Sequence, residues 1–313
     1  MNAHVPVLLD RVLELLAPTV TGDAPVIVDA TLGLGGHTEA LLERFDDLRV
    51  IGIDRDPTAI ERSRERLARF GERVTIVHAV YDQIGDVVAD LGLTAVNGVL
   101  FDLGVSSMQL DVAERGFAYS QEAPLDMRMN SEDTLTAADV LNTYAAPDLV
   151  RVLREYGDEK FASRIVEGVV GRREREPFTT NRALLEIIDA AIPAPARRRG
   201  GNPAKRTFQA LRIEVNDELG AYRRALPEAL DVIAPGGRVV VMAYHSLEDR
   251  ITKRAFAAVT TSSAPRDLPV VPVQMQPRFR LVTRGAEVAT DEEIDQNRRA
   301  KPVRLRAVER LAS

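Results

Sequence analysis

Short hydrophobic runs alternate with stretches of helical spacing along the first hundred residues of the chain. Four of these runs predict buried strands, at 25–29, 49–54, 74–77 and 98–101. Three stretches with apolar residues every three or four positions predict helices between them, at 36–45, 57–70 and 84–91. Strands that are apolar along their whole length and separated by helices indicate a parallel sheet covered on both faces.

The alternation stops at residue 108 and resumes near residue 220. The intervening segment has no comparable strand pattern, and its helical stretches lie at 137–141, 147–156, 160–170, 181–191 and 206–218. The run 197–206, RRRGGNPAKR, reads as a flexible basic connection into the last of these helices.

Strand and helix signals return in the last third of the chain. A helix at 222–233 leads through a tight turn, Pro235-Gly236-Gly237, into a fifth strand at 238–244. Ser246 is a candidate N-cap for the next helix, with Asp249 in its first turn. Two late strands follow at 279–284 and 303–308. We expect an α/β domain built from 1–107 with 220–313, and a helical insert at 108–219.

The composition of the chain excludes several classes of function. The chain has 313 residues, 45% of them hydrophobic and 28% charged, as expected for a globular protein. It has no Cys, which excludes disulfides and a cysteine nucleophile, and its four His lack metal-ligand spacing. We therefore expect no metal. We also expect no membrane association and a cytoplasmic location, because no apolar run approaches about 18 residues and the N-terminus does not resemble a signal peptide.

Charge is distributed unevenly along the chain. The net charge is −6, but residues 172–212 hold ten Lys or Arg against four Asp or Glu. Residues 294–313 hold six basic residues against two acids. Basic segments on an acidic body suit a surface that follows phosphates, although Arg-rich helices can also be merely solvated.

A glycine-rich turn follows the first predicted strand. The segment 29–37 reads DATLGLGGH, and a turn of this kind lets the backbone approach a ligand before a helix N-terminus. The dinucleotide fingerprint requires a third glycine at position 38, where the chain has Thr38. A pyrophosphate-binding version of this turn is therefore weakened, and a purely structural turn stays open.

Polar residues stand at the ends of four predicted strands. Asp29, Asp54 and Asp102 end the first, second and fourth strands, and 244–246 ends the fifth. Carboxyl ends of parallel strands meet at one edge, where ligands of open sheets bind. Asp54 follows Gly36 by 18 residues and suits the two hydroxyls of a ribose, in NAD or in S-adenosylmethionine. Tyr81, after the third strand, could lie against adenine or pack at the edge of the core.

Eight blocks of the sequence, in order along nearly the whole chain, resemble the bacterial 16S ribosomal RNA cytosine-N4 methyltransferase family. They are HVPVLLD at 4–10, DATLGLGGH at 29–37, GIDRDP at 52–57, DLGVSS at 102–107, ERGF at 114–117, PLDMRM at 124–129, RTFQALRI at 206–213 and HSLEDR at 245–250. The resemblance implies a class I methyltransferase (Rossmann-like) fold, S-adenosylmethionine as methyl donor, and a cytosine in the decoding region of the small subunit as acceptor.

Carried onto matching positions, the resemblance also implies which residues contact the cofactor. These are Gly35, Gly36, His37, Asp54, Tyr81, Asp102 and Gln109. The implied partner is 16S rRNA or the small ribosomal subunit. The oligomeric state stays open, a homo-oligomer included.

The chemistry of amine methylation gives Asp102 and His245 candidate catalytic roles. The lone pair of an exocyclic amine is delocalised into the ring, so the protein must orient the amine and accept its hydrogen bonds. The Asp102 carboxylate, or the carbonyls of Leu103 and Gly104, could do this. His245 could receive the departing proton or only make an orienting hydrogen bond. Four rings are candidates to stack on the target base, namely Phe117, Tyr119, Phe208 and Tyr244.

The insert carries the residues expected to bind RNA. Basic groups beside an aromatic ring suit an unstacked base and its phosphates. The candidates are Arg197, Arg198, Arg199, Lys205, Arg206, Phe208 and Arg212. The base must leave its helix or loop to be methylated.

Two other classes of function stay open at this point. One is a nicotinamide-dependent oxidoreductase, against which Thr38 and the two late strands count. The other is a non-catalytic RNA-binding assembly factor that retains a nucleotide-binding fold.

Overall fold

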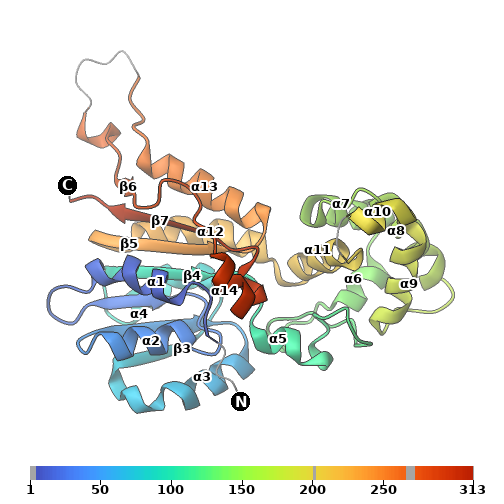
Figure 1. Ribbon diagram of the computed structural model, residues 1–313, viewed down its shortest axis with the longest axis horizontal. Coiled ribbons are helices and arrows are strands. Elements are labelled where there is room, and N and C mark those ends of the chain that lie inside the picture. Colours follow the sequence, from blue (N-terminus) through green and yellow to red (C-terminus); the bar gives the residue numbers. More distant parts are fainter. Residues whose placement is uncertain (1–4, 200–201, 266–271, 313) are drawn as a thin grey trace. The chain divides into compact units, whose positions relative to one another are not determined.

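The structure is a computed structural model that describes residues 5–199, 202–265 and 272–312 (Figure 1). The chain forms two compact units. We call Met1–Gly104 with Gly220–Ser313 the sheet unit, and Val105–Leu219 the helical unit.

Seven strands form a single sheet in the order β3-β2-β1-β4-β5-β7-β6. Strands β1 to β5 run parallel, and β7 lies antiparallel between β5 and β6. Their bounds are Val26–Asp29 (β1), Arg49–Asp54 (β2), Val74–His78 (β3), Val96–Asp102 (β4), Ile233–Ala243 (β5), Phe279–Leu281 (β6) and Arg304–Arg310 (β7). The predicted fold class, a mostly parallel seven-stranded sheet with a helical insert, is confirmed.

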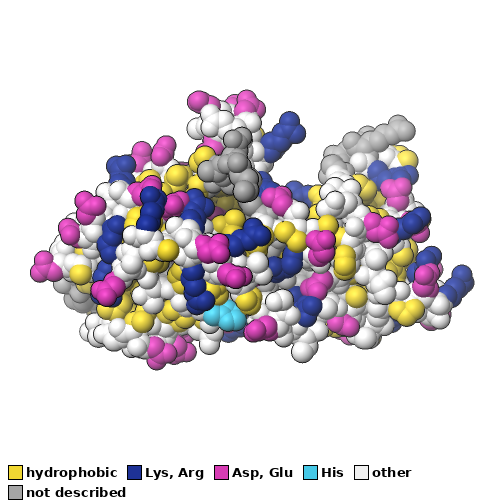
Figure 2. All heavy atoms as spheres, turned by 90° about the horizontal axis from the view of Figure 1, so that it is seen from below, with side chains coloured by type: hydrophobic (Ala, Val, Ile, Leu, Met, Phe, Trp, Pro, Cys, Tyr) yellow, Lys and Arg dark blue, Asp and Glu magenta, His cyan; other side chains and the backbone are white. Residues whose placement is uncertain are grey.

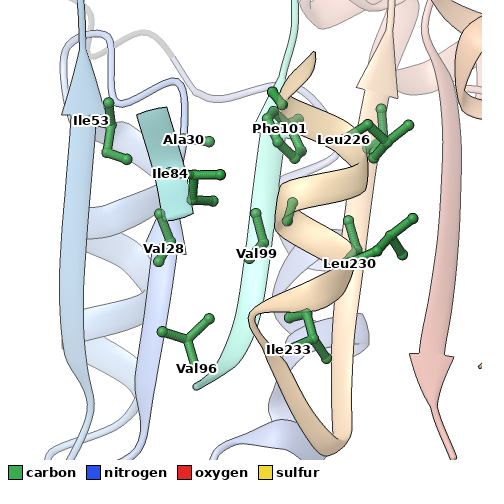
Figure 3. Close-up of a cluster of buried hydrophobic side chains, with 14 of the residues drawn as sticks. Val28, Ala30, Ile53, Ile84, Val96, Val99, Phe101, Leu226, Leu230 and Ile233 are labelled. Carbon is green, nitrogen blue, oxygen red and sulfur yellow. The ribbon is translucent and has the colours of Figure 1, made fainter. Parts of the chain in front are cut away.

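Helices cover both faces of this sheet. One face packs on α4 (Ile84–Asp90), α12 (Glu218–Asp231) and α13 (Ser246–Thr260), and Figure 3 shows side chains of α4 and α12 in this cluster. The other packs on α1 (Leu9–Leu16), α2 (Gly36–Arg44) and α14 (Asp291–Gln296), while α3 (Pro57–Leu67) lies against β2 and β3. Val28 enters the first cluster and its neighbour Ile27 the second, so consecutive side chains of β1 are buried on opposite faces.

Two local features of the sheet unit differ from the sequence prediction. The segment Pro235-Gly236-Gly237 lies inside β5, where the register with β4 shifts, rather than in a turn before it. Gly236 has φ +79° and a Cβ on Gly237 would lie 2.6 Å from the Asn97 carbonyl oxygen, so glycine is required at this irregularity. Helix α1 was not predicted, although it buries Val12 and Leu16 completely.

The helical unit buries a core of its own. Its helices are α5 (Ser107–Asp111), α6 (Ala137–Thr143), α7 (Ala146–Gly157), α8 (Ala162–Arg173), α9 (Asn181–Ala191), α10 (Ala194–Arg199) and α11 (Ala204–Asn216). A Cβ on Gly157 would lie 2.5 Å from the Arg206 carbonyl oxygen, so glycine lets α7 approach α11 closely. The basic residues at 197–199 lie in the helix α10 rather than in a flexible run, and Pro195 stands in the first turn of that helix, where proline is tolerated.

Among the described residues, no helix has the length and apolarity needed to cross a membrane. The same residues contain no cluster of three or more His, Asp or Glu arranged to hold a metal ion.

Candidate active site

Three carboxylates stand at the carboxyl edge of the sheet. Asp29 ends β1, Asp54 ends β2 and Asp102 ends β4, and these strands are hydrogen-bonded neighbours in parallel register. Burial raises the pKa of all three carboxyls, because desolvation penalises their charged forms. An edge of this kind suits hydroxyl and cationic groups of a ligand better than a dianionic pyrophosphate.

Asp54 closes the glycine turn onto β2. Its Oδ2 accepts the Gly33 backbone N–H at 2.7 Å, and its Oδ1 accepts that of Asp56 at 2.8 Å. Desolvation outweighs these two bonds and raises the pKa of Asp54 to about 6. The side chain remains partly exposed, and a carboxylate has further acceptor positions. The geometry therefore leaves Asp54 able to accept ribose hydroxyls when it is ionised.

Thr38 explains why the chain lacks the third glycine of a dinucleotide fingerprint. Thr38 is fully buried, and its hydroxyl donates to Asp29 Oδ2 at 2.8 Å. The Thr31 backbone N–H donates to Asp29 Oδ1 at 3.3 Å. The residue at position 38 thus neutralises part of the cost of burying Asp29 instead of making room for a phosphate.

The glycines of the turn meet protein atoms closely. Gly35 has φ +75° and precedes α2, and a Cβ on it would lie 3.0 Å from Leu67 Cδ1. A Cβ on Gly36 would lie 2.7 Å from Pro6 Cγ. Packing therefore favours glycine at both positions, as does the positive φ of Gly35, and their contact with a cofactor stays a prediction.

Asp102 is the most elaborately contacted of the three acids. Its Oδ1 accepts the Tyr244 phenol at 2.6 Å, and its Oδ2 lies 3.7 Å from His37 Nδ1. Its backbone N–H donates to Thr31 Oγ1 at 2.6 Å. His37 is buried and its Nε2 lies 3.1 Å from the Val7 carbonyl oxygen, which fixes the ring beside the acid.

His245 stands at the start of α13, where the sequence predicted Ser246 as the cap. That prediction is wrong: Ser246 is the first helical residue, and the cap is made by Glu248, which accepts the backbone N–H of His245 at 3.2 Å. Asp249, the predicted partner, is paired with Arg306 at 2.7 Å. His245 Nε2 lies 3.0 Å from Glu248 Oε1, but out of line for a hydrogen bond.

Two of the residues predicted to contact the cofactor make contacts that stabilise the fold. Tyr81 is half-buried, and its ring meets Phe101 edge-on with centroids 5.9 Å apart. Gln109 belongs to the helical unit, where its Oε1 accepts the Ser106 N–H at 3.0 Å in a capping box for α5. The structure therefore brings Gly35, His37, Asp54 and Asp102 together within one unit and places Gln109 in the other.

A pocket of about 180 Å³ opens in the helical unit. Three aromatic rings and three polar side chains line it, namely Phe117, Tyr119, Phe208, Lys205, Gln209 and Arg212. The rings of Tyr119 and Phe208 meet edge-on at 5.4 Å. Phe208 is only 3% exposed, so it lines the pocket as part of the core.

Two of the predicted RNA-binding arginines are paired with acids. Arg212 donates to both carboxylate oxygens of Glu218, at 2.7 and 2.9 Å, and Arg197 lies 2.8 Å from Asp189. Lys205 and Arg206 are exposed on α11. The side chains of Arg198 and Arg199 lie outside the described part of the structure.

The surface also mixes charges. On the face drawn in Figure 2, basic and acidic side chains alternate rather than gather by sign. A sum of charges along the sequence therefore overstates the free positive charge of the insert.

Sequence reasoning missed the supporting residues Thr31 and Glu248, and the role of Tyr244. Tyr244 lies 142 positions from Asp102, and only the pairing of β4 with β5 brings them together. The role of Glu248 could have been predicted, because an acid three residues after a helix N-cap is a known signal. The sequence prediction placed the cap and its acid one residue too late.

The strand order and the acids at the ends of β1, β2 and β4 define a class I methyltransferase. The chain matches the model of the MraW methylase family over residues 1–311, and it belongs to that family.

Its relatives include proteins named ribosomal RNA small subunit methyltransferase H. The one from a Nocardioides species is 65% identical over 310 residues, which cover 99% of this chain and 97% of the relative. That of Streptomyces avermitilis is 58% identical over 99% of this chain and 98% of its own. That of Mycolicibacterium smegmatis is 56% identical over 99% of this chain and 84% of its own.

Proposed function

We propose that this protein transfers a methyl group from S-adenosylmethionine to the exocyclic N4 amine of a cytosine in small-subunit (16S) ribosomal RNA. Membership of the MraW methylase family, with relatives named as small-subunit rRNA methyltransferases, carries the proposal. An rRNA substrate in bacteria also favours a cytoplasmic location.

The donor set at the sheet edge fits S-adenosylmethionine. When bound, this cofactor supplies an electrophilic methyl group on a sulfonium. Asp54, at the end of β2, would accept the ribose hydroxyls, and Asp102, at the end of β4 on the other side of β1, would face the methionine part. Three strand-end acids favour a cationic cofactor over NAD, whose pyrophosphate would add negative charge beside Asp29.

Asp102 would act on the incoming amine as a hydrogen-bond acceptor. An acceptor bond that strengthens as the nitrogen becomes tetrahedral stabilises the transition state more than the bound substrate. His245, whose ring nitrogens are buried and whose Nε2 lies 3.0 Å from Glu248 Oε1, is our candidate to take the amine proton.

The helical unit would bind the RNA around the target cytosine. Lys205 stands beside the aromatic lining of the pocket, an arrangement that suits a base and its phosphate. We keep Lys205 and Arg206 as phosphate contacts, while the pairing of Arg212 with Glu218 gives it a structural part. Cofactor contact by Gly35, Gly36, His37, Tyr81 and Gln109 remains part of the proposal.

Methyl transfer to defined substrates tests the proposed function. The protein is incubated with methyl-labelled S-adenosylmethionine and either naked 16S rRNA or assembled small subunits that lack the modification, with Asp102→Ala as the matched control. We expect labelled N4-methylcytidine on nucleoside analysis of one substrate or both. Label in another nucleoside would overturn the assignment to N4, and no transfer to either substrate would favour an assembly factor.

A further inference from the structure

Tyr244 joins the ends of two strands that are far apart in the sequence. It follows β5, and its phenol donates to Asp102 Oδ1 at 2.6 Å, at the end of β4. Its ring lies beside Gly104, since a Cβ on that glycine would be 3.6 Å from Tyr244 Cδ2. Gly104 has φ +100°, a conformation that L side chains rarely adopt. One side chain thus contacts both the acid and the turn that carries the carbonyl acceptors.

Tyr244 is itself held in place by a buried acid. Its backbone N–H donates to Glu248 Oε2 at 2.7 Å, and Glu248 is only 3% exposed. The ring is therefore fixed at its backbone by α13 and at its hydroxyl by Asp102. A ring anchored in this way is poorly suited to swing onto a substrate base, so we remove Tyr244 from the candidate stacking residues.

We propose that Tyr244 is a positioning residue that fixes the orientation of the Asp102 carboxylate for methyl transfer. The assignment rests on the proposed function of Asp102. A phenol that donates a short hydrogen bond holds one carboxylate oxygen in place and leaves Oδ2 for other partners. It also favours the charged form of the acid.

Some of the other groups that face Asp102 lower its pKa, and others raise it. His37, on α2, lies 3.7 Å from Oδ2 and lowers the pKa of Asp102, as the Tyr244 hydrogen bond does. Glu248, on α13, raises it, and the like charge of Asp102 raises the pKa of Asp29, on β1. Burial dominates, and the pKa of Asp102 is raised overall. Removing the phenol therefore moves the pKa of Asp102 further upward.

Tyr244→Phe tests this role because it deletes only the hydroxyl and keeps the ring against Gly104. Tyr222→Phe is the matched control: Tyr222 is also buried in the sheet unit, but its hydroxyl pairs with Thr252 at 2.7 Å. Single-turnover methyl transfer is measured from pH 5 to 9 at saturating cofactor and RNA. For Tyr244→Phe we expect the acid limb of the profile to move up by about one pH unit, which is about a tenfold lower rate on that limb. Tyr222→Phe should keep the wild-type profile.

A second measurement follows the pKa of Asp102 without depending on methyl transfer. Carbon-13 NMR of aspartate carboxyls, with Asp102→Asn to assign the signal, follows the titration of Asp102 directly. We expect its midpoint to rise by about one pH unit in Tyr244→Phe and not in Tyr222→Phe. An unchanged midpoint would overturn the inference even if the wild-type protein methylates rRNA. A shifted midpoint in a protein with no methyl transfer would support the positioning and reject the function.

Discussion

If Asp54 binds the ribose, as we propose, its pKa makes cofactor affinity a function of pH. Because the pKa of the carboxyl is about 6 and the ionised form would accept the ribose hydroxyls, protonation would compete with S-adenosylmethionine. For a single group of pKa about 6, the ionised fraction falls about tenfold between pH 7 and pH 5, or about 1.4 kcal/mol of binding free energy. We expect the measured dissociation constant to rise by that factor.

The same group gives an opposite trend in the stability of the unliganded fold. The pKa of Asp54 is higher in the folded protein than its ordinary value of 3.8, so the folded state binds the proton more tightly. Its contribution to stability is therefore greatest below pH 4 and is lost as the pH rises through about 6. Because we expect the cofactor to bind more tightly at pH 7 than at pH 5, S-adenosylmethionine should raise the melting temperature more at pH 7.

Isothermal calorimetry from pH 5 to 8 measures the predicted affinity change. Asp54→Asn should bind more weakly at pH 7 and depend less on pH than the wild type, since one of the three titrating carboxyls at this edge is gone. Asp90→Asn, at an exposed position of α4, is the control and should follow the wild type. A dissociation constant that is constant over this range in the wild-type protein would refute the assignment of Asp54 to the ribose.

Three further predictions concern the other parts of the site. Asp102→Asn should slow single-turnover methyl transfer about a hundredfold at saturating cofactor and RNA, and a near-wild-type rate would leave it a binding role only. Replacing Lys205 and Arg206 with Ala should weaken RNA binding and flatten its dependence on salt by about 0.7 in log–log slope for each phosphate that is no longer neutralised, with cofactor affinity unchanged. Thr38→Val should lower the free energy of unfolding by about 1–3 kcal/mol, because the buried Asp29 loses a donor, and urea denaturation that shows no change would contradict that role.

Patterns local in sequence predicted more of this molecule than contacts between distant residues. The strand at Arg49–Asp54 was predicted to the residue, because a buried parallel strand is apolar along its length and ends where it meets solvent. The strand-end acids followed from the same rule. The pairing of Arg212 with Glu218 was not predicted, since it depends on how the chain turns after α11.

Departures from a motif proved as informative as matches to it. Thr38 argued against a pyrophosphate, and its bond to Asp29 supplies the physical reason. The glycines were harder to interpret. Either contact with a cofactor or close packing against Pro6 would favour glycine at position 36, and the sequence does not distinguish the two.

The position of the helical unit within the chain affects how the protein folds during synthesis. Val105–Leu219 is continuous in sequence, so this unit can fold as soon as it has left the ribosome. The sheet unit cannot, because β4 pairs with β5, whose residues are translated more than 130 positions later. Until then β4 presents an open parallel edge of buried-type residues, the kind of edge that pairs with other chains. We therefore expect a stage of synthesis in which the helical unit has folded while the sheet unit is still incomplete, and we expect chaperones to bind at this stage.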